Sequence, residues 1–175
     1  MERTKWMERQ FALENSLGLL PNIIERLRGT PIRLRHICNS LSAQDLEFKY
    51  NDKWSIKEHI GHLNDLESLH EGRIEDFLNR KEILRAADMT NAATYKANHN
   101  SQDVEHLLKI FETARHTFIE HLLRLDDATQ KFSSLHPRLK QMMRPVDMAF
   151  FTAEHDDQHF AIIRETLNKL DKKDA

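Results

Sequence analysis

Residues 150–163 carry the sequence FFTAEHDDQHFAII, in which two histidines lie four positions apart inside an apolar stretch. Side chains four positions apart share one face of an α-helix and lie about 6 Å apart along its axis. His155 and His159 could therefore both reach one metal ion. An unpaired polar ring facing a protein core costs about 1–3 kcal/mol. Two inward-facing imidazoles are therefore easier to explain as metal ligands than as packing.

The pattern around this pair predicts one long amphipathic helix, from about Pro145 to Leu170. At about 100° per residue, its apolar side chains fall in a stripe about 120° wide, and both histidines lie near the centre of that stripe. The alternative is a hydrogen-bonded pair of core histidines. The interior of a helical bundle is, however, where metal sites of this kind are built. The apolar positions of the stripe are Met148, Phe151, Ile162, Ile163 and Leu170.

Three more long helices are predicted upstream of this one. The first runs from about Pro31 to Leu41, because Gly29-Thr30-Pro31 is typical of a helix stop followed by a new start. The second begins at the capping box Ser55-Ile56-Lys57-Glu58 and continues to about Phe77 or Leu78. The third begins at a Ser101 cap and carries apolar residues at helical spacing from Val104 to Leu122.

The segments between these helices complete the predicted architecture. Short helical pieces precede Pro31, with Pro21 suited to a first helical position. Residues 80–100 are polar and predict a long loop with some helix, and no segment alternates with period two. We expect one all-α domain over residues 1–175: a four-helix bundle with short N-terminal helices and one long crossover loop.

Composition restricts the class of protein. The formal charge of −2 argues against a nucleic-acid binder, which would carry a basic excess. No apolar run approaches the about 18 residues of a membrane span, and no signal-like segment follows Met1. The single Cys38 cannot form an internal disulfide, and its apolar neighbours predict a small buried side chain. We expect a soluble cytoplasmic protein without nucleic-acid or membrane partners.

A metal would need at least a third protein ligand. The helix predicted from Ser55 offers His59, His62 and His70. Helical periodicity places His59 and His70 nearer the middle of its apolar stripe and His62 toward the edge. Spacing alone therefore leaves the third ligand open.

Two blocks of the sequence resemble the DinB/YfiT-like family of helical-bundle proteins. The first is Trp54-Ser55-Ile56-Lys57-Glu58-His59-Ile60-Gly61-His62-Leu63, similar to the family's Trp-Ser pair followed by a helical histidine. The second is His155-Asp156-Asp157-Gln158-His159, similar to the family's His-x-x-x-His near the C-terminus. The resemblance covers nearly the whole chain. It implies a three-histidine metal site formed by His62, His155 and His159.

The other histidines are expected to play smaller parts. His59 stands where the family more often has an aliphatic residue, so we expect it to pack at the helix edge, with contact to a ligand as the alternative. His99 is expected to be an ordinary loop residue, with lining a pocket as the alternative. Solvated positions are expected for His70, His106, His116 and His121.

Three neutral imidazoles suit Zn²⁺, Ni²⁺, Co²⁺, Fe²⁺ or Mn²⁺, and the ligand type does not select among them. The resemblance implies a metal-dependent hydrolase, or an enzyme that transfers a low-molecular-weight thiol or uses it as a cofactor. Two other classes would show a similar sequence. One is a non-catalytic metal-binding or stress-response module of the same fold, and the other is a structural bundle without metal.

Four acids lie near the predicted ligands: Asp65, Glu67, Glu154 and Asp156. We expect the acids to be solvated or capping carboxylates, with Glu67, nearest the inward stripe, as the candidate general acid or base.

The substrate is expected to be a small molecule. The N-terminal residues Trp6, Phe11 and Leu19-Leu20 should cap the bundle or pair with a second subunit, and the resemblance favours a homodimer.

Overall fold

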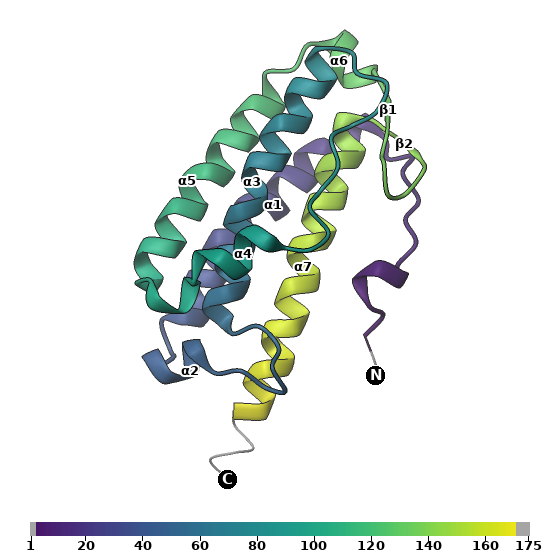
Figure 1. The fold of residues 1–175 in the computed structure, drawn as a ribbon. Coiled ribbons are helices and arrows are strands. Elements are labelled where there is room, and N and C mark those ends of the chain that lie inside the picture. The colour runs from purple at the N-terminus through teal and green to yellow at the C-terminus, as the bar shows by residue number, and fades with distance from the viewer. Residues whose placement is uncertain (1–2, 171–175) are drawn as a thin grey trace.

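Four long helices form the bundle in the computed structural model, which describes residues 3–170. They are α1 (Leu20–Cys38), α3 (Ile56–Leu78), α5 (Val104–Leu123) and α7 (Pro145–Leu170). Helices α3 and α5 run in one direction, and α1 and α7 run in the opposite direction (Figure 1). Because α3 and α5 are parallel, the chain must cross from one end of the bundle to the other between them. The predicted all-α four-helix bundle with one long crossover is confirmed.

The remaining elements are short. Their bounds are η1 (Trp6–Glu8), η2 (Leu17–Leu19), α2 (Ala43–Glu47), α4 (Ala92–Ala97), η3 (His99–Ser101), α6 (Asp127–Lys131), β1 (Ser134–Leu135) and β2 (Met142–Met143). The two strands form an antiparallel hairpin, in which Ser134 pairs with Met143 and Leu135 pairs with Met142. Ile83 of the crossover bridges to Leu135. The sequence predicted no strand because two-residue strands are too short to show an alternating pattern.

Helix α1 runs straight through Gly29-Thr30-Pro31, where the sequence predicted a break. Gly29 does not adopt a positive φ, so it is not the left-handed residue that ends many helices. Leu27 and Leu34, on either side of Pro31, are both fully buried. One apolar face therefore packs across the proline, and this packing outweighs the about 3 kcal/mol that an interior proline costs.

The predicted start of α3 is confirmed, and the predicted start of α5 is wrong. Ser55 begins α3 as predicted, because its Oγ accepts a hydrogen bond from Glu58 N at 3.2 Å and the Glu58 carboxylate accepts one from Ser55 N at 2.8 Å. Helix α5 is capped by Asp103, whose carboxylate accepts from His106 N at 2.9 Å. The predicted cap, Ser101, lies in η3 instead. Both residue types are good caps, so the sequence did not distinguish between them.

The apolar core consists of two clusters, one toward each end of the bundle. The first joins the start of α1 and α7 to the ends of α3 and α5, and includes Ile74, Phe77 and Phe118. The second joins the end of α1 to the starts of α3 and α5, and includes Ile60 and Phe111. Cys38 is buried in the second cluster, as predicted.

A buried ion-pair network lies between these two clusters. Arg115 of α5 donates through Nε and Nη2 to Glu67 Oε1 of α3, at 3.0 and 2.7 Å, and also pairs with Asp156 of α7. Thr30 of α1 donates to Asp156 Oδ2 at 2.7 Å. One network of ion pairs and hydrogen bonds therefore links all four long helices. The prediction that Glu67 and Asp156 are solvated or capping acids is wrong, because each has a partner on another helix.

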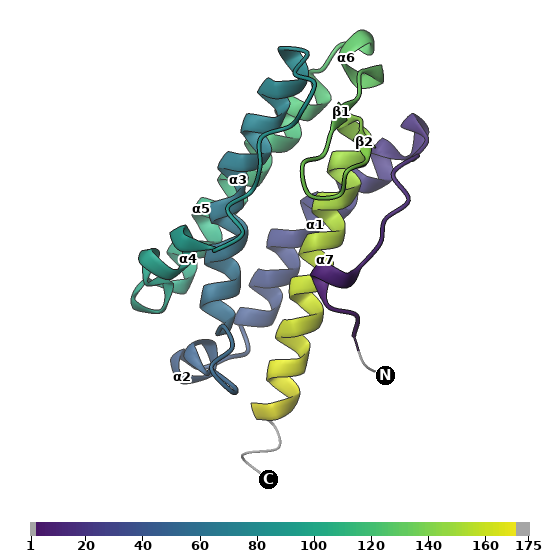
Figure 2. The same ribbon diagram turned by 45° about the vertical axis from the view of Figure 1, so that its right-hand side comes forward.

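The N-terminal segment packs along α7 (Figures 1 and 2). The ring centroids of Trp6 and Phe11 lie 4.9 and 5.0 Å from that of Phe151. These contacts confirm that the segment covers the bundle. Its pairing with a second subunit stays a prediction.

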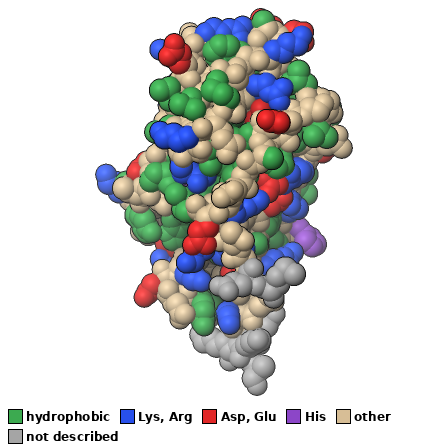
Figure 3. Space-filling model, turned by 90° about the vertical axis from the view of Figure 1, so that its right-hand side faces the viewer, with side chains coloured by type: hydrophobic (Ala, Val, Ile, Leu, Met, Phe, Trp, Pro, Cys, Tyr) green, Lys and Arg blue, Asp and Glu red, His purple; other side chains and the backbone are tan. Residues whose placement is uncertain are grey.

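Charges of both signs are interspersed over the face that carries the N-terminal segment, and histidine contributes little of this surface (Figure 3). No described helix is both long enough and apolar enough to span a lipid bilayer.

Candidate metal centre

Three histidines from two helices converge near the middle of the bundle. One ring nitrogen from each of His62, His155 and His159 lies within 4.8 Å of the other two. Helix α7 contributes two of them because His155 and His159 are one turn apart on the same face. Helix α3 passes α7 in the opposite direction and brings His62 to this pair. The structure therefore brings the three predicted ligands together, and their binding of a metal stays a prediction.

Burial keeps these three rings neutral. The pKa of His62 falls to about 4, mainly because burial penalises the charged ring and more weakly because His99 is nearby, against an opposing effect of Asp65. Burial and the neighbouring histidines hold the pKa values of His155 and His159 well below 6.5. A neutral imidazole has a lone pair on one nitrogen, which is the form that binds a metal.

The contact between the two α7 rings suits a shared cation. Nε2 of His155 and Nε2 of His159 lie 3.2 Å apart. Two nitrogen ligands at Zn–N distances of about 2.0–2.1 Å on a tetrahedral ion are separated by about 3.3 Å. A donor set of neutral imidazoles is also one that divalent transition metals accept. These residues could therefore hold a divalent metal.

The second nitrogen of His62 is held by a hydrogen-bond chain. Thr94 of α4 donates its hydroxyl hydrogen to Asp65 Oδ2 at 2.9 Å. Nδ1 of His62 lies 3.0 Å from the same hydroxyl oxygen. Because the only hydroxyl hydrogen points to Asp65, we infer that Nδ1 of His62 carries a hydrogen and donates it. This arrangement leaves the lone pair on Nε2, and it is the kind of outer support that metal-binding histidines usually have.

His99 supports the same chain from the crossover segment. Its Nε2 lies 2.9 Å from Asp65 Oδ2, and its side chain is buried. The ring packs directly against the backbone of Gly61. The expectation of an ordinary loop residue is therefore wrong. A glycine inside a predicted helix was the one signal in the sequence, since it marks a place where another group can come close.

His59 contacts a predicted ligand instead of packing at a helix edge. Its Nδ1 lies 2.8 Å from Nδ1 of His159, and burial lowers its pKa to about 3. If His159 donates this hydrogen, its Nε2 is free to face His155 and His62. The alternative that the sequence left open, contact with a ligand, is what the structure shows.

Two tryptophans cover the cluster. The centroid of the Trp54 ring lies 4.6 Å from that of the His62 ring. The Trp54 ring also stacks on the His159 ring, with 6.3 Å between their centroids. Trp6 contacts His155 edge-on at 4.9 Å. Both rings limit the access of water to the three histidines, and an apolar surrounding of this kind tunes the properties of a metal site.

Comparisons with known proteins identify the family and a solved structure of the same fold. The model of the DinB superfamily matches residues 26–163. The chain belongs to the DinB superfamily. A solved structure with the same fold is that of YfiT from Bacillus subtilis, described as a probable metal-dependent hydrolase with an unusual four-helix bundle topology. Its TM-score is 0.78 at 19% sequence identity, and the match covers 93% of each chain. A comparison with curated proteins finds no match.

The remaining histidines of this DinB superfamily member are divided between the surface and the core. His106 and His116 are exposed, as predicted. His121 is only partly exposed, because its Nδ1 contacts Glu71 at 2.5 Å. The prediction of a solvated His70 is wrong: its ring is buried and packs 5.4 Å from that of Phe118. The position of His70 on the inward stripe of α3 predicted its burial better than the polarity of its ring did.

Of the four acids considered from the sequence, only Asp65 has a hydrogen-bond chain to a predicted ligand. Glu154 forms ion pairs with Arg9 and Arg26. Glu67 uses Oε1 for Arg115, while its buried Oε2 has no partner among residues 3–170. Burial raises the pKa of Glu67 to about 7, although Arg115 opposes that rise. A role for Glu67 as general acid or base stays a prediction.

A cleft of about 340 Å³ opens beside His62, between α3 and the crossover. Seven of the twelve residues that line it are polar or charged, and the other five are leucines and alanines. The side chains along it are His62, Asp65, Leu66, Ser68, Leu69, Arg85, Ala86, Ala87, Asp88, Asn91, Ala93 and Thr94.

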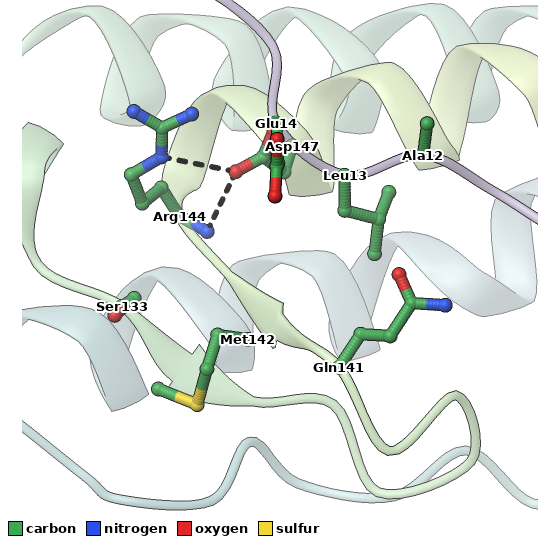
Figure 4. Close-up of a pocket in the computed structure, with 8 residues that line it drawn as sticks. All are labelled: Ala12, Leu13, Glu14, Ser133, Gln141, Met142, Arg144 and Asp147. Carbon is green, nitrogen blue, oxygen red and sulfur yellow. Dashed lines mark hydrogen bonds and ion pairs between the residues drawn. The ribbon is translucent and has the colours of Figure 1, made fainter.

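A larger cavity of about 800 Å³ lies where the N-terminal segment meets the hairpin and the start of α7 (Figure 4). None of the three predicted ligands lines it. Its buried carboxylate, Asp147, accepts hydrogen bonds from Arg144 Nε at 3.1 Å and from Asn15 N at 2.9 Å. Because this acid is fully engaged in holding the segment to α7, the cleft beside His62 is the better candidate for a substrate site.

Proposed function

We propose that this chain is a metal-dependent hydrolase in which His62, His155 and His159 bind one divalent transition metal. The observation that carries the proposal is the convergence of three neutral imidazoles within 4.8 Å. The hydrogen bond from His62 to Thr94 supports it, because that contact leaves Nε2 of His62 as the free nitrogen. The fold shared with YfiT, described as a probable metal-dependent hydrolase, supports the same class.

Three protein ligands leave a position for water, and a divalent metal lowers the pKa of such a water toward neutrality. The chain would do the rest. Thr94 and Asp65 orient the His62 ring, and Trp54 limits the access of bulk water. The cleft beside His62 has the volume for a small-molecule substrate. The donor set is compatible with Zn²⁺, Ni²⁺, Fe²⁺ or Mn²⁺, and a low-molecular-weight thiol is a further candidate for the same coordination position.

Metal binding is tested first. Protein purified without a histidine tag should contain close to one equivalent of metal, or regain it from Zn²⁺ or Ni²⁺ after chelation. His159→Ala should lose the metal and destabilise the bundle only modestly. The control is His106→Ala, because His106 is an exposed histidine on α5. Full metal content in His159→Ala would show that the ligand assignment is wrong.

Turnover is tested with ester and amide substrates and with electrophile and thiol pairs. The metal-loaded wild type should hydrolyse a member of the first two groups, and His62→Ala should not. Activity that His62→Ala keeps would not belong to this site. Bound metal without turnover in any group would favour a non-catalytic metal-binding module.

A further inference from the structure

Two buried nitrogens of the hairpin and one of α3 have no hydrogen-bond partner among residues 3–170. They are His70 Nδ1, His136 Nε2 and Arg138 Nη2. A buried polar group without a partner costs about 1–3 kcal/mol, so native proteins contain few of them. The two on the hairpin, His136 Nε2 and Arg138 Nη2, therefore have the capacity to bond to a water or a ligand.

Two guanidinium groups in this region also lack an acid. Arg73 is 2% exposed, and its one hydrogen bond in the described chain runs from Nε to the carbonyl of Arg85 at 3.2 Å. Arg138 is half-buried, and within residues 3–170 it donates only to the Met7 sulfur, at 3.9 Å. Neither forms an ion pair with a carboxylate of residues 3–170, although buried arginines usually do.

Backbone contacts bring these side chains together. Arg73 bonds to Arg85, and the preceding residue, Leu84, donates from its backbone N to the carbonyl of Leu135 at 3.1 Å. His136 follows Leu135 directly. His136 and the guanidinium of Arg138 both pack on Phe151 of α7, at 5.3 and 5.5 Å from its ring centroid. The cluster thus lies where α3, the crossover, the hairpin and α7 meet.

This cluster carries positive charge that no carboxylate of residues 3–170 offsets. Burial lowers the pKa of Arg73 to about 10, and Arg138 and Arg85 lower it further against the opposing effect of Asp76. The carboxylate of Asp76 is already bound by Arg85, at 3.0 and 3.1 Å. Burial, Arg73 and Arg138 together lower the pKa of His136 to about 3. A bound water could satisfy the nitrogens, but only an anion would also offset the positive charge.

We propose that this cluster binds a carboxylate or phosphate group of a small molecule, with Arg73 and Arg138 as the charged donors and His136 beside them. Guanidinium groups suit this task, because their planar donors match two oxygens of a carboxylate or phosphate at once. That the small molecule is the substrate of the metal centre rests on the proposed hydrolase function. The binding of the anion does not.

The cluster lies near the metal centre. Phe151 precedes His155 by one turn of α7, about 6 Å, and His70 follows His62 by about 12 Å on α3. Trp6 contacts both sites, at 4.9 Å from the His155 ring and 5.8 Å from the Arg138 guanidinium. Arg85, whose carbonyl accepts the hydrogen bond from Arg73, lines the cleft beside His62, whereas neither Arg73 nor Arg138 lines it.

The test uses calorimetric titration of the full chain, freed of metal by chelation, with inorganic phosphate and with succinate as separate probes. At least one should bind saturably. Arg138→Gln should weaken that binding on the order of ten-fold or more, the loss of one charge-assisted contact. His136→Gln is a second variant in case the first misfolds. Arg124→Gln, which alters an exposed arginine of α5's C-terminal end, should bind the probe as the wild type does.

The result with His159→Ala separates this proposal from the proposed function. Anion binding should persist in that variant even though its metal is lost. Absence of saturable binding of both probes would overturn the anion site, whatever the metal analysis shows. Unchanged affinity in both Arg138→Gln and His136→Gln would overturn it as well.

Discussion

The imidazole of His99 lies directly against Gly61 of α3, so that a Cβ at position 61 would come within 2.2 Å of Cγ of His99. The same ring holds Asp65, which accepts from Thr94, and Thr94 in turn lies 3.0 Å from Nδ1 of His62. A glycine in the middle of a helix thus makes room for the outer support of a predicted metal ligand.

Gly61→Ala should destabilise the protein and weaken metal binding. The new methyl group must displace a buried ring, and overpacking of this kind costs about 1–3 kcal/mol. The better helix propensity of alanine offsets no more than about 1 kcal/mol of that cost. Urea denaturation and a competition titration with a metal chelator would measure the two effects.

Gly29→Ala is the matched control, because Gly29 also lies inside a long helix. The nearest atom to a Cβ at position 29 is Arg33 Nε at 3.9 Å, so the methyl group fits. This variant should be more stable by about 0.5–1 kcal/mol and should bind metal normally. Equal changes in stability for the two variants would contradict the role given to the Gly61 contact.

Thr94→Val should weaken metal binding while leaving the bundle folded. The substitution removes the hydroxyl between His62 and Asp65, and loss of such an outer partner typically costs 10–100-fold, or about 1.4–3 kcal/mol, in metal affinity. Thr113→Val is the control, since that hydroxyl bonds only to the carbonyl of Lys109 on an exposed face. Competition titrations on both variants would check this, and an unchanged affinity in Thr94→Val would remove the hydroxyl from the site.

Arg115→Met should be among the most destabilising substitutions in the chain. It leaves Glu67 and Asp156 buried without their shared partner, and removal of one member of a buried ion network costs about 3–5 kcal/mol. Arg124→Met alters an exposed arginine and should change the free energy of unfolding by no more than about 0.5 kcal/mol. Urea denaturation gives both values, and a loss in Arg115→Met as small as in the control would show that the network does not hold the four helices together.

The elements that the sequence predicted best are those whose signals are local. Both bonds of the capping box at Ser55 are formed, and α7 spans Pro145 to Leu170 as its apolar stripe indicated. The break predicted at Pro31 failed because a local signal, Gly-Thr-Pro, was overridden by packing against other helices. Propensity yields to tertiary contacts in such cases.

The residues that the sequence placed wrongly owe their positions to partners far away in the chain. His99 is buried because Asp65, 34 residues away, accepts its hydrogen bond. Glu67 is buried because Arg115, 48 residues away, pairs with it. A single sequence shows the polarity of a side chain but not whether a distant group will satisfy it. For this reason the motif alone pointed to the three predicted ligands and left the contact of His59 as an alternative, whereas the supporting hydrogen bonds appear only in the folded chain.

The last prediction concerns the pH dependence of stability at Glu67. Burial raises its pKa from an ordinary 4.5 to about 7, against the opposing effect of Arg115. Between these two pH values the folded chain holds a proton on Glu67 that the unfolded chain has lost. The contribution of this group to stability is therefore full below pH 4.5 and is lost as the pH rises toward 7.

Glu67→Gln isolates this effect, because the amide stays neutral throughout. The buried histidines have lowered pKa values and make stability rise with pH, but they are present in both proteins and cancel in the difference. The free energy of unfolding of the wild type minus that of Glu67→Gln should fall from pH 4.5 to about 7 and then level off. Urea denaturation at half-unit pH steps measures this difference. If it rises with pH instead, attraction to Arg115 outweighs burial, and Glu67 is an ordinary ionised acid at neutral pH.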